Sequence, residues 1–155
     1  MAEQLYWEDV EEGTEVTPLP KVASTRMLVK WAGASGDFNA LHFDDEFSRT
    51  QGESGRIVHG ALKRQWLVQL VTDWMGEEGT LKKFSCQYRM TDRPRGMKSN
   101  TVPLDEGETW WCRGTVAKKY VEGDEHLVDC DIRLENGNAD VTTPGKATVV
   151  LPSRG

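Results

Sequence analysis

The stretch "GALKRQWLVQLVTDWM", residues 60–75, decides the fold class because it predicts one long helix. Its apolar side chains recur at helical spacing and cover a face too broad for a surface helix. These side chains are Leu62, Trp66, Leu67, Leu70, Val71, Trp74 and Met75. Gly76 and Gly79 follow and predict the end of the helix. We therefore expect a central, mostly buried helix.

After this helix the sequence changes to strand periodicity. In "HLVDCDIRLEN", residues 126–136, apolar and polar side chains alternate without a break from Val128 onward. Asn136-Gly137 then predicts a tight turn. Further strands are predicted at residues 81–89, 109–120 and 146–152. One central helix followed by such strands predicts an α+β fold, with a curved antiparallel sheet packed against the helix.

Two shorter helices are expected ahead of the central one. "STRMLVKWAGAS", residues 24–35, begins with Ser24 as an N-cap and continues with apolar residues at helical spacing. A second short helix is expected to begin at Asp44 or Asp45 and to carry Phe47.

Length and composition restrict the class of protein. A chain of 155 residues fits a single domain, residues 1–155. The net charge of −6 argues against nucleic-acid binding, and the absence of a long apolar run argues against a membrane span. The acidic N-terminus is unlike a signal peptide, and three cysteines without CxxC spacing predict reduced thiols. We therefore expect a cytoplasmic location.

The stretch "GASGDFNALHFDDEF", residues 33–47, brings together candidate catalytic groups. His42 follows Asp37 by five positions on a short turn, where Asn39 can satisfy backbone groups. A carboxylate and an imidazole on one turn could act on the same water molecule, one accepting a proton while the other orients it. Ordinary turn chemistry is the alternative for these residues.

A second candidate is His59-Gly60, directly before the central helix. Backbone N–H groups at a helix start are unpaired and lie at the positive end of the helix dipole. Because Gly60 has no side chain, its N–H could polarise a carbonyl oxygen. Gly60 could also serve only as a helix start, but its conjunction with Asp37 and His42 favours function.

Together, "ASGDFNALHFDDEF" and "GRIVHGAL" resemble the signature of the MaoC-like, R-specific enoyl-CoA hydratase family of hotdog-fold proteins. That family's pattern is Ser-Gly-Asp-x-Asn-Pro-(apolar)-His, followed by an acidic turn with Phe and then Val-His-Gly. The resemblance extends over nearly the whole chain, to the terminal "GKATVVLP". It implies a single MaoC-like hotdog domain, in which the sheet wraps around the long central helix.

The resemblance also implies an activity, that of a hydro-lyase. Asp37 and His42 match the pair that activates water, and the Gly60 N–H matches the group that holds the thioester oxygen. The family's supporting positions at the substrate site are matched here by Ser35, Asn39 and His59. Water would add to a trans-2-enoyl-CoA thioester, or an R-3-hydroxyacyl thioester would be dehydrated. The coenzyme A thioester is the substrate, and neither a metal nor another cofactor is implied.

Three departures from the family pattern stand out. Ala40 replaces the usual Pro, and Val68 replaces a small polar residue found in some hydratases. Residues 90–108 form a longer connection, which includes the cationic run "RPRGMK". We interpret this run either as a solvated loop or as a contact for the phosphates of coenzyme A through Arg93, Arg95 and Lys98.

Several alternatives remain open at the level of sequence. A sheet with one buried helix leaves a face or edge to cover, so we expect a homodimer or a heteromer with a second hotdog subunit. In a heteromer, this chain could be a non-catalytic or pocket-sharing subunit of an acyl-thioester dehydratase. A non-catalytic acyl-thioester binding module and a hotdog thioesterase are the further alternatives.

Overall fold

The protein is described by a computed structural model that covers residues 4–96 and 109–155. A short 3-10 helix η1 (Trp7–Asp9) and strand β1 (Glu15–Lys21) come first. They are followed by α1 (Thr25–Ser35), the 3-10 helix η2 (Ala40–His42), α2 (Asp45–Thr50) and α3 (Gly60–Met75). Strands β2 (Thr80–Cys86), β3 (Trp110–Glu122), β4 (Glu125–Glu135) and β5 (Val141–Val150) complete the order.

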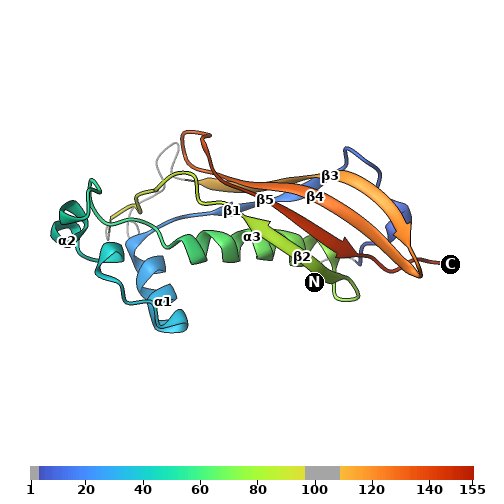
Figure 1. The fold of residues 1–155 in the computed structure, drawn as a ribbon, viewed down its shortest axis with the longest axis horizontal. Coiled ribbons are helices and arrows are strands. Elements are labelled where there is room, and N and C mark those ends of the chain that lie inside the picture. The colour runs from blue at the N-terminus through green and yellow to red at the C-terminus, as the bar shows by residue number, and fades with distance from the viewer. Residues whose placement is uncertain (1–3, 97–108) are drawn as a thin grey trace.

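The strands form one five-stranded sheet in the order β1-β3-β4-β5-β2, and neighbouring strands pair antiparallel. Helix α3 runs along one face of this sheet, while α1 and α2 lie at one end of the molecule (Figure 1). The predicted α+β architecture, with an antiparallel sheet packed on a central helix, is confirmed.

The core lies between α3 and the sheet. It is formed by the buried side chains that the two periodicities predict, because helical spacing and strand alternation each place apolar residues on one side. From α3 they are Leu62, Trp66, Leu67, Leu70, Val71 and Met75, and from β3 and β4 they are Cys112, Val116, Val128, Cys130, Ile132 and Leu134. The polar side chains that alternate with them along β4 are more exposed, as expected for the opposite side of the strand.

Side-chain and glycine caps fix the ends of the helices that precede α3. Ser24 accepts a hydrogen bond from the Met27 N–H, as predicted, and Asp44 caps α2 by accepting from Glu46 and Phe47. Gly36 ends α1 with a φ of 75°, a left-handed conformation that favours glycine. The chain therefore turns sharply at Gly36, just before Asp37.

The largest differences from the predicted strand boundaries lie at the start of β5 and the end of β2. Strand β5 begins at Val141 rather than residue 146, because pairing with β4 carries it through Pro144 and Gly145 despite their low strand propensity. Strand β2 ends at Cys86, although the Gln87 N–H still donates to the Pro144 carbonyl.

The three cysteines are free, and Cys112 and Cys130 are buried in the core. Burial raises the pKa of each of these two thiols to about 12, so both stay protonated. Within the described residues, no helix has the length and apolar character that crossing a membrane requires.

Candidate active site

The turn between α1 and η2 is held by its own side chains. Ser35 Oγ donates to the Trp31 carbonyl at 2.8 Å and accepts from the Asp37 N–H at 3.2 Å. Asn39 Oδ1 accepts from the Leu41 N–H at 3.0 Å, which caps η2. The side chains of Ser35 and Asn39 thus bind the backbone of the turn and fix the orientation of Asp37.

His42 faces Asp37 across a gap suited to one water molecule. His42 Nε2 lies 3.8 Å from Asp37 Oδ2, which is too long for a direct hydrogen bond but allows a bridging water. His42 Nδ1 lies 2.9 Å from the Ile57 carbonyl oxygen, which can only accept. In the neutral ring the proton therefore sits on Nδ1, and the Nε2 lone pair is directed toward Asp37.

His59 supports His42 from behind. The two rings stack with centroids 3.6 Å apart, and His59 is completely buried. His59 Nε2 donates to the Asp37 carbonyl at 3.2 Å, while its Nδ1 has no partner. Burial, followed by the neighbouring His42, lowers the pKa of His59, so this ring is neutral near pH 7.

Gly60 is the first residue of α3, and His59 precedes it without forming a side-chain cap. Its N–H therefore belongs to the set that a helix start leaves without an intrahelical partner. The ring of Tyr88 lies over Gly60, so a Cβ at this position would come within 3.1 Å of Tyr88 Cε2. Glycine thus permits a close approach here, as the sequence predicts.

Asp37, His42 and His59 could also converge on a cation, since each offers one ligand atom and these atoms lie within 4.8 Å of one another. The hydrogen bonds above leave the lone pairs of His42 Nε2 and His59 Nδ1 available in the neutral rings. The set has the donor chemistry of a zinc site, but the gap between Asp37 and His42 equally fits water.

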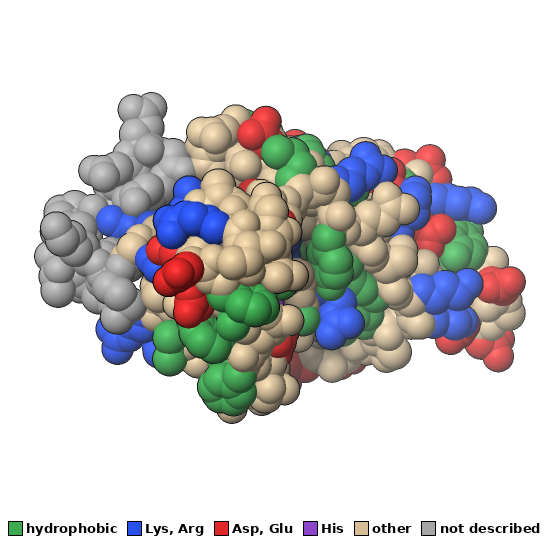
Figure 2. Space-filling model, turned by 60° about the vertical axis from the view of Figure 1, so that its left-hand side comes forward, with side chains coloured by type: hydrophobic (Ala, Val, Ile, Leu, Met, Phe, Trp, Pro, Cys, Tyr) green, Lys and Arg blue, Asp and Glu red, His purple; other side chains and the backbone are tan. Residues whose placement is uncertain are grey.

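An apolar pocket of about 190 Å³ borders the two histidine rings. Its lining is Leu28, Val29, Ala32, Phe38, His42, Phe43 and His59. Phe38 and Phe43 are more than half exposed. Hydrophobic side chains gather on the lower front of the molecule in Figure 2, which brings the end that bears α1 and α2 forward. This end therefore combines the candidate pair Asp37 and His42 with an exposed apolar surface.

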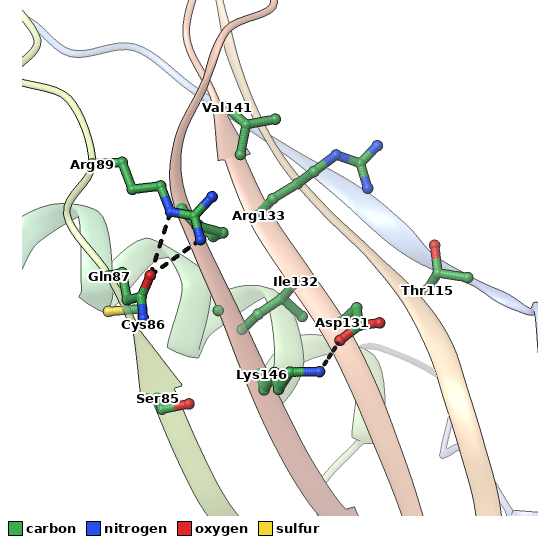
Figure 3. A pocket seen from close by; sticks show the side chains of 12 residues that line it. Ser85, Cys86, Gln87, Arg89, Thr115, Asp131, Ile132, Arg133, Val141 and Lys146 are labelled. Atoms are coloured by element: carbon green, nitrogen blue, oxygen red, sulfur yellow. Dashed lines mark hydrogen bonds and ion pairs between the residues drawn. The ribbon is translucent and has the colours of Figure 1, made fainter.

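A larger pocket of about 630 Å³ lies elsewhere, on the sheet (Figure 3). It is bordered by charged side chains such as Asp131, Arg133 and Lys146, two of which pair with each other. Among the residues that the structure describes, no predicted site residue lines it. We therefore place the candidate site at the start of α3, where proton acceptors and a free helix start meet.

The cationic run is only partly described. Arg93 is exposed beside Gly55, and Arg95 forms backbone hydrogen bonds with Ala23 and Thr25. Lys98 lies outside the described residues. The structure therefore places Arg93 and Arg95 near the start of α1 and the loop before α3, and their contact with a ligand stays a prediction.

Sequence reasoning missed three residues around the start of α3: Lys63, Tyr88 and Asp92. Lys63 is buried and pairs with Asp92 at 3.0 Å. Its spacing from Leu67 and Leu70 is helical, a signal that could have placed it on the buried face. Tyr88 and Asp92 approach α3 from the segment after β2, and no local pattern predicts that contact.

Comparison with known proteins identifies relatives over most of this chain. The family model of the MaoC like domain matches residues 9–91. The (R)-specific enoyl-CoA hydratase of Rhodospirillum rubrum is 26% identical over 157 aligned residues, which cover 97% of this chain and 94% of that protein.

Solved structures share the fold at lower identity. An R-hydratase from Pseudomonas aeruginosa matches with a TM-score of 0.78 and 18% identity, over 97% of this chain and 88% of that one. An (R)-hydratase from A. caviae gives a TM-score of 0.74 and 21% identity, over 94% and 99%. A chain of the ChsH1–ChsH2 complex from Mycobacterium tuberculosis gives 0.73 and 18%, over 92% and 98%.

Proposed function

This chain belongs to the MaoC-like family, and we propose that it is a hydro-lyase acting on a trans-2-enoyl-CoA thioester. Its fold is the hotdog fold, with the antiparallel sheet around α3. The curated relative, named an (R)-specific enoyl-CoA hydratase, supports this activity. The reverse reaction is the dehydration of an R-3-hydroxyacyl thioester.

One observation carries the proposal: His42 Nε2 and Asp37 Oδ2 lie 3.8 Å apart, next to the start of α3. A water molecule between them contacts two proton acceptors, because the Ile57 carbonyl keeps the His42 proton on Nδ1. The pair removes one proton from this water while the water oxygen bonds to C3 of the substrate. The same pair then returns one proton to C2, so the reaction balances without another reactant.

The Gly60 N–H supplies the electrostatic part of the mechanism. When water attacks C3, the electrons of the double bond move toward the thioester carbonyl and its oxygen becomes negative. An N–H at the positive end of α3 stabilises this charge. A single donor of this kind contributes about 3 kcal/mol to transition-state stabilisation in comparable sites. No group other than the coenzyme A thioester is needed in this scheme.

A panel of enoyl-CoA substrates of varied length and branching tests the proposal. We expect wild-type protein to consume the double bond of at least one of them and to form the R-3-hydroxy product. Formation of the S product, or release of free thiol without hydration, would contradict the proposal and favour an unrelated hydratase or a thioesterase.

A second candidate is a subunit that shares its acyl pocket with a partner. Phe38 and Phe43 are exposed beside the histidine pair, which favours a partner that covers them. A chain of the ChsH1–ChsH2 complex is also among the structural neighbours. We propose a homodimer as the simpler assembly, located in the cytoplasm as the free cysteines suggest. Activity in a homodimer of defined mass would argue against a required partner.

A further inference from the structure

The first turn of α3 contains a buried ion pair that the mechanism above does not use. Lys63 lies three residues after Gly60, and only 2% of its side chain is exposed. Its Nζ donates to Asp92 Oδ2 at 3.0 Å and to the Met90 carbonyl at 2.9 Å. Asp92 Oδ1 accepts from Asn136 Nδ2 at 3.3 Å. The two charges are therefore paired and hydrogen-bonded away from solvent.

Stability alone does not explain this pair. A lysine in the first turn of a helix lies at the positive end of the helix dipole, which disfavours a cation. Moving both charges out of water carries a further cost, so apolar residues of similar size are often as stabilising as a buried pair or more so. Because the Lys63–Asp92 pair adds little stability, its role is better sought in the backbone that it holds in place.

The contact is with the backbone that carries the candidate oxygen-binding group. The Asp92 carbonyl accepts from the Val58 N–H at 2.8 Å, two residues before Gly60. Tyr88, from the same segment as Asp92, lies over Gly60. Lys63 binds this segment through both the Asp92 carboxylate and the Met90 carbonyl. The segment from Tyr88 to Asp92 is thus fastened to the start of α3 on both sides of Gly60.

We propose that Lys63 and Asp92 are a positioning pair for the reaction, which holds the Gly60 N–H and the Tyr88 ring where the thioester carbonyl docks. The inference rests on the proposed function, since this arrangement matters for catalysis only if a thioester binds there. Both charged side chains are almost fully buried, so the proposed role does not require either to touch the substrate. The pair acts through Val58 on one side of Gly60 and through the segment after β2 on the other.

The double variant Lys63→Met/Asp92→Asn tests the proposal, because it removes both charges together and leaves neither buried and unpaired. We expect its Tm to stay within a few degrees of wild type, while kcat for enoyl-CoA hydration falls about tenfold to hundredfold. KM should change less than about threefold, because the misplaced N–H acts mainly on charge that develops in the transition state. Each single variant should lower Tm more than the double variant does.

Leu151→Ala is the matched control for lost stability. Leu151 is a buried core residue that follows β5, whose end lies far from α1 in Figure 1. Its truncation should lower Tm and leave kcat near wild type. An equal loss of kcat in Leu151→Ala, or a wild-type kcat in the double variant, would overturn the positioning role.

Amide hydrogen exchange separates this inference from the proposed function. The N–H groups of Val58, Leu62 and Lys63 donate to the Asp92 and His59 carbonyls, so they report on the same backbone. In the double variant we expect exchange at residues 58, 62 and 63 to become at least about tenfold faster, with residues 70 and 71 unchanged. If wild type hydrates no enoyl-CoA, the proposed function fails. Unchanged exchange would independently overturn the positioning role.

Discussion

The rings of His42 and His59 stack with their centroids 3.6 Å apart and their planes inclined by 21°. Only one of the two faces the gap to Asp37, since His59 is completely buried and donates to the Asp37 carbonyl. His59 therefore fixes both the ring of His42, by stacking, and the backbone of Asp37, by its hydrogen bond. Protonation of His59 would place a positive charge against the His42 ring and oppose this arrangement.

Stability should consequently fall when the pH drops below about 6.5. Burial and then His42 lower the pKa of His59 from its ordinary value of 6.5, so the unfolded chain binds the proton first. The free energy of unfolding that neutral His59 contributes is fully present above about pH 6.5 and is lost progressively as the pH falls below it. We expect Tm to fall between about pH 7.5 and about pH 5.5 more in wild type than in His59→Gln.

The distant His126→Gln serves as the control for this experiment, because His126 packs against Trp7 rather than at the site. It should keep the wild-type difference in Tm between the two pH values. Parallel curves for wild type and His59→Gln would contradict a neutral, buried His59.

Gly60→Ala should lower activity with little loss of stability. The substitution keeps the N–H, and alanine is the better helix former, but the new Cβ would meet the Tyr88 ring at 3.1–3.2 Å. We expect kcat/KM to fall about tenfold because the ring or the methyl group intrudes beside the docked carbonyl. Tyr88→Ala removes this contact. In a Tyr88→Ala background, Gly60→Ala should therefore lower kcat/KM less than it does in wild type. Purely additive effects would show that Tyr88 does not limit the space at Gly60.

Asn39→Ala should affect catalysis more than a comparable change at the next helix cap. Asn39 caps η2 and holds the turn between Asp37 and His42, whereas Asp44 caps α2. Loss of a cap costs about 1 kcal/mol, so Asn39→Ala and Asp44→Ala should lower Tm similarly. We expect only Asn39→Ala to reduce kcat by about tenfold or more. Equal kcat values in the two variants would mean that the turn does not control the catalytic pair.

Replacing Arg93, Arg95 and Lys98 together by alanine tests the coenzyme A contact. If these cations bind phosphates, KM for an acyl-CoA should rise about tenfold, and the effect should weaken with added salt. KM for the same acyl group on a short thiol without phosphates should not change. Lys146→Ala, on the sheet near Asp131, is the control cation. An unchanged KM for acyl-CoA in the triple variant would leave this loop without a role in binding.

The sequence predicts those parts of the fold that depend on local periodicity and caps. The apolar spacing from Leu62 to Met75 gives α3 its observed bounds, and Ser24 and Asp44 cap the two helices they were expected to begin. The alternation in β4 likewise matches its buried face. These features depend on neighbours within a few residues, so the sequence shows them directly.

Contacts between distant segments could not be predicted in this way. Pro144 and Gly145 disfavour a strand locally, but pairing with β4 outweighs that preference. Likewise, the partner of Lys63 arrives from a segment 29 positions away, and its burial becomes acceptable only once Asp92 is in place. The candidate pair Asp37 and His42 was accessible to sequence reasoning because one short turn carries both.

Hydration of an enoyl-CoA by wild type and by Asp37→Asn tests whether Asp37 and His42 activate one water. Asp37→Asn keeps the shape of the turn and removes the proton acceptor, so we predict a fall in kcat of at least about 100-fold with an unchanged Tm. Asp44→Asn, at the neighbouring cap, should retain wild-type activity. Full activity in Asp37→Asn, with the R-3-hydroxy product still formed, would exclude Asp37 as a proton acceptor in the reaction.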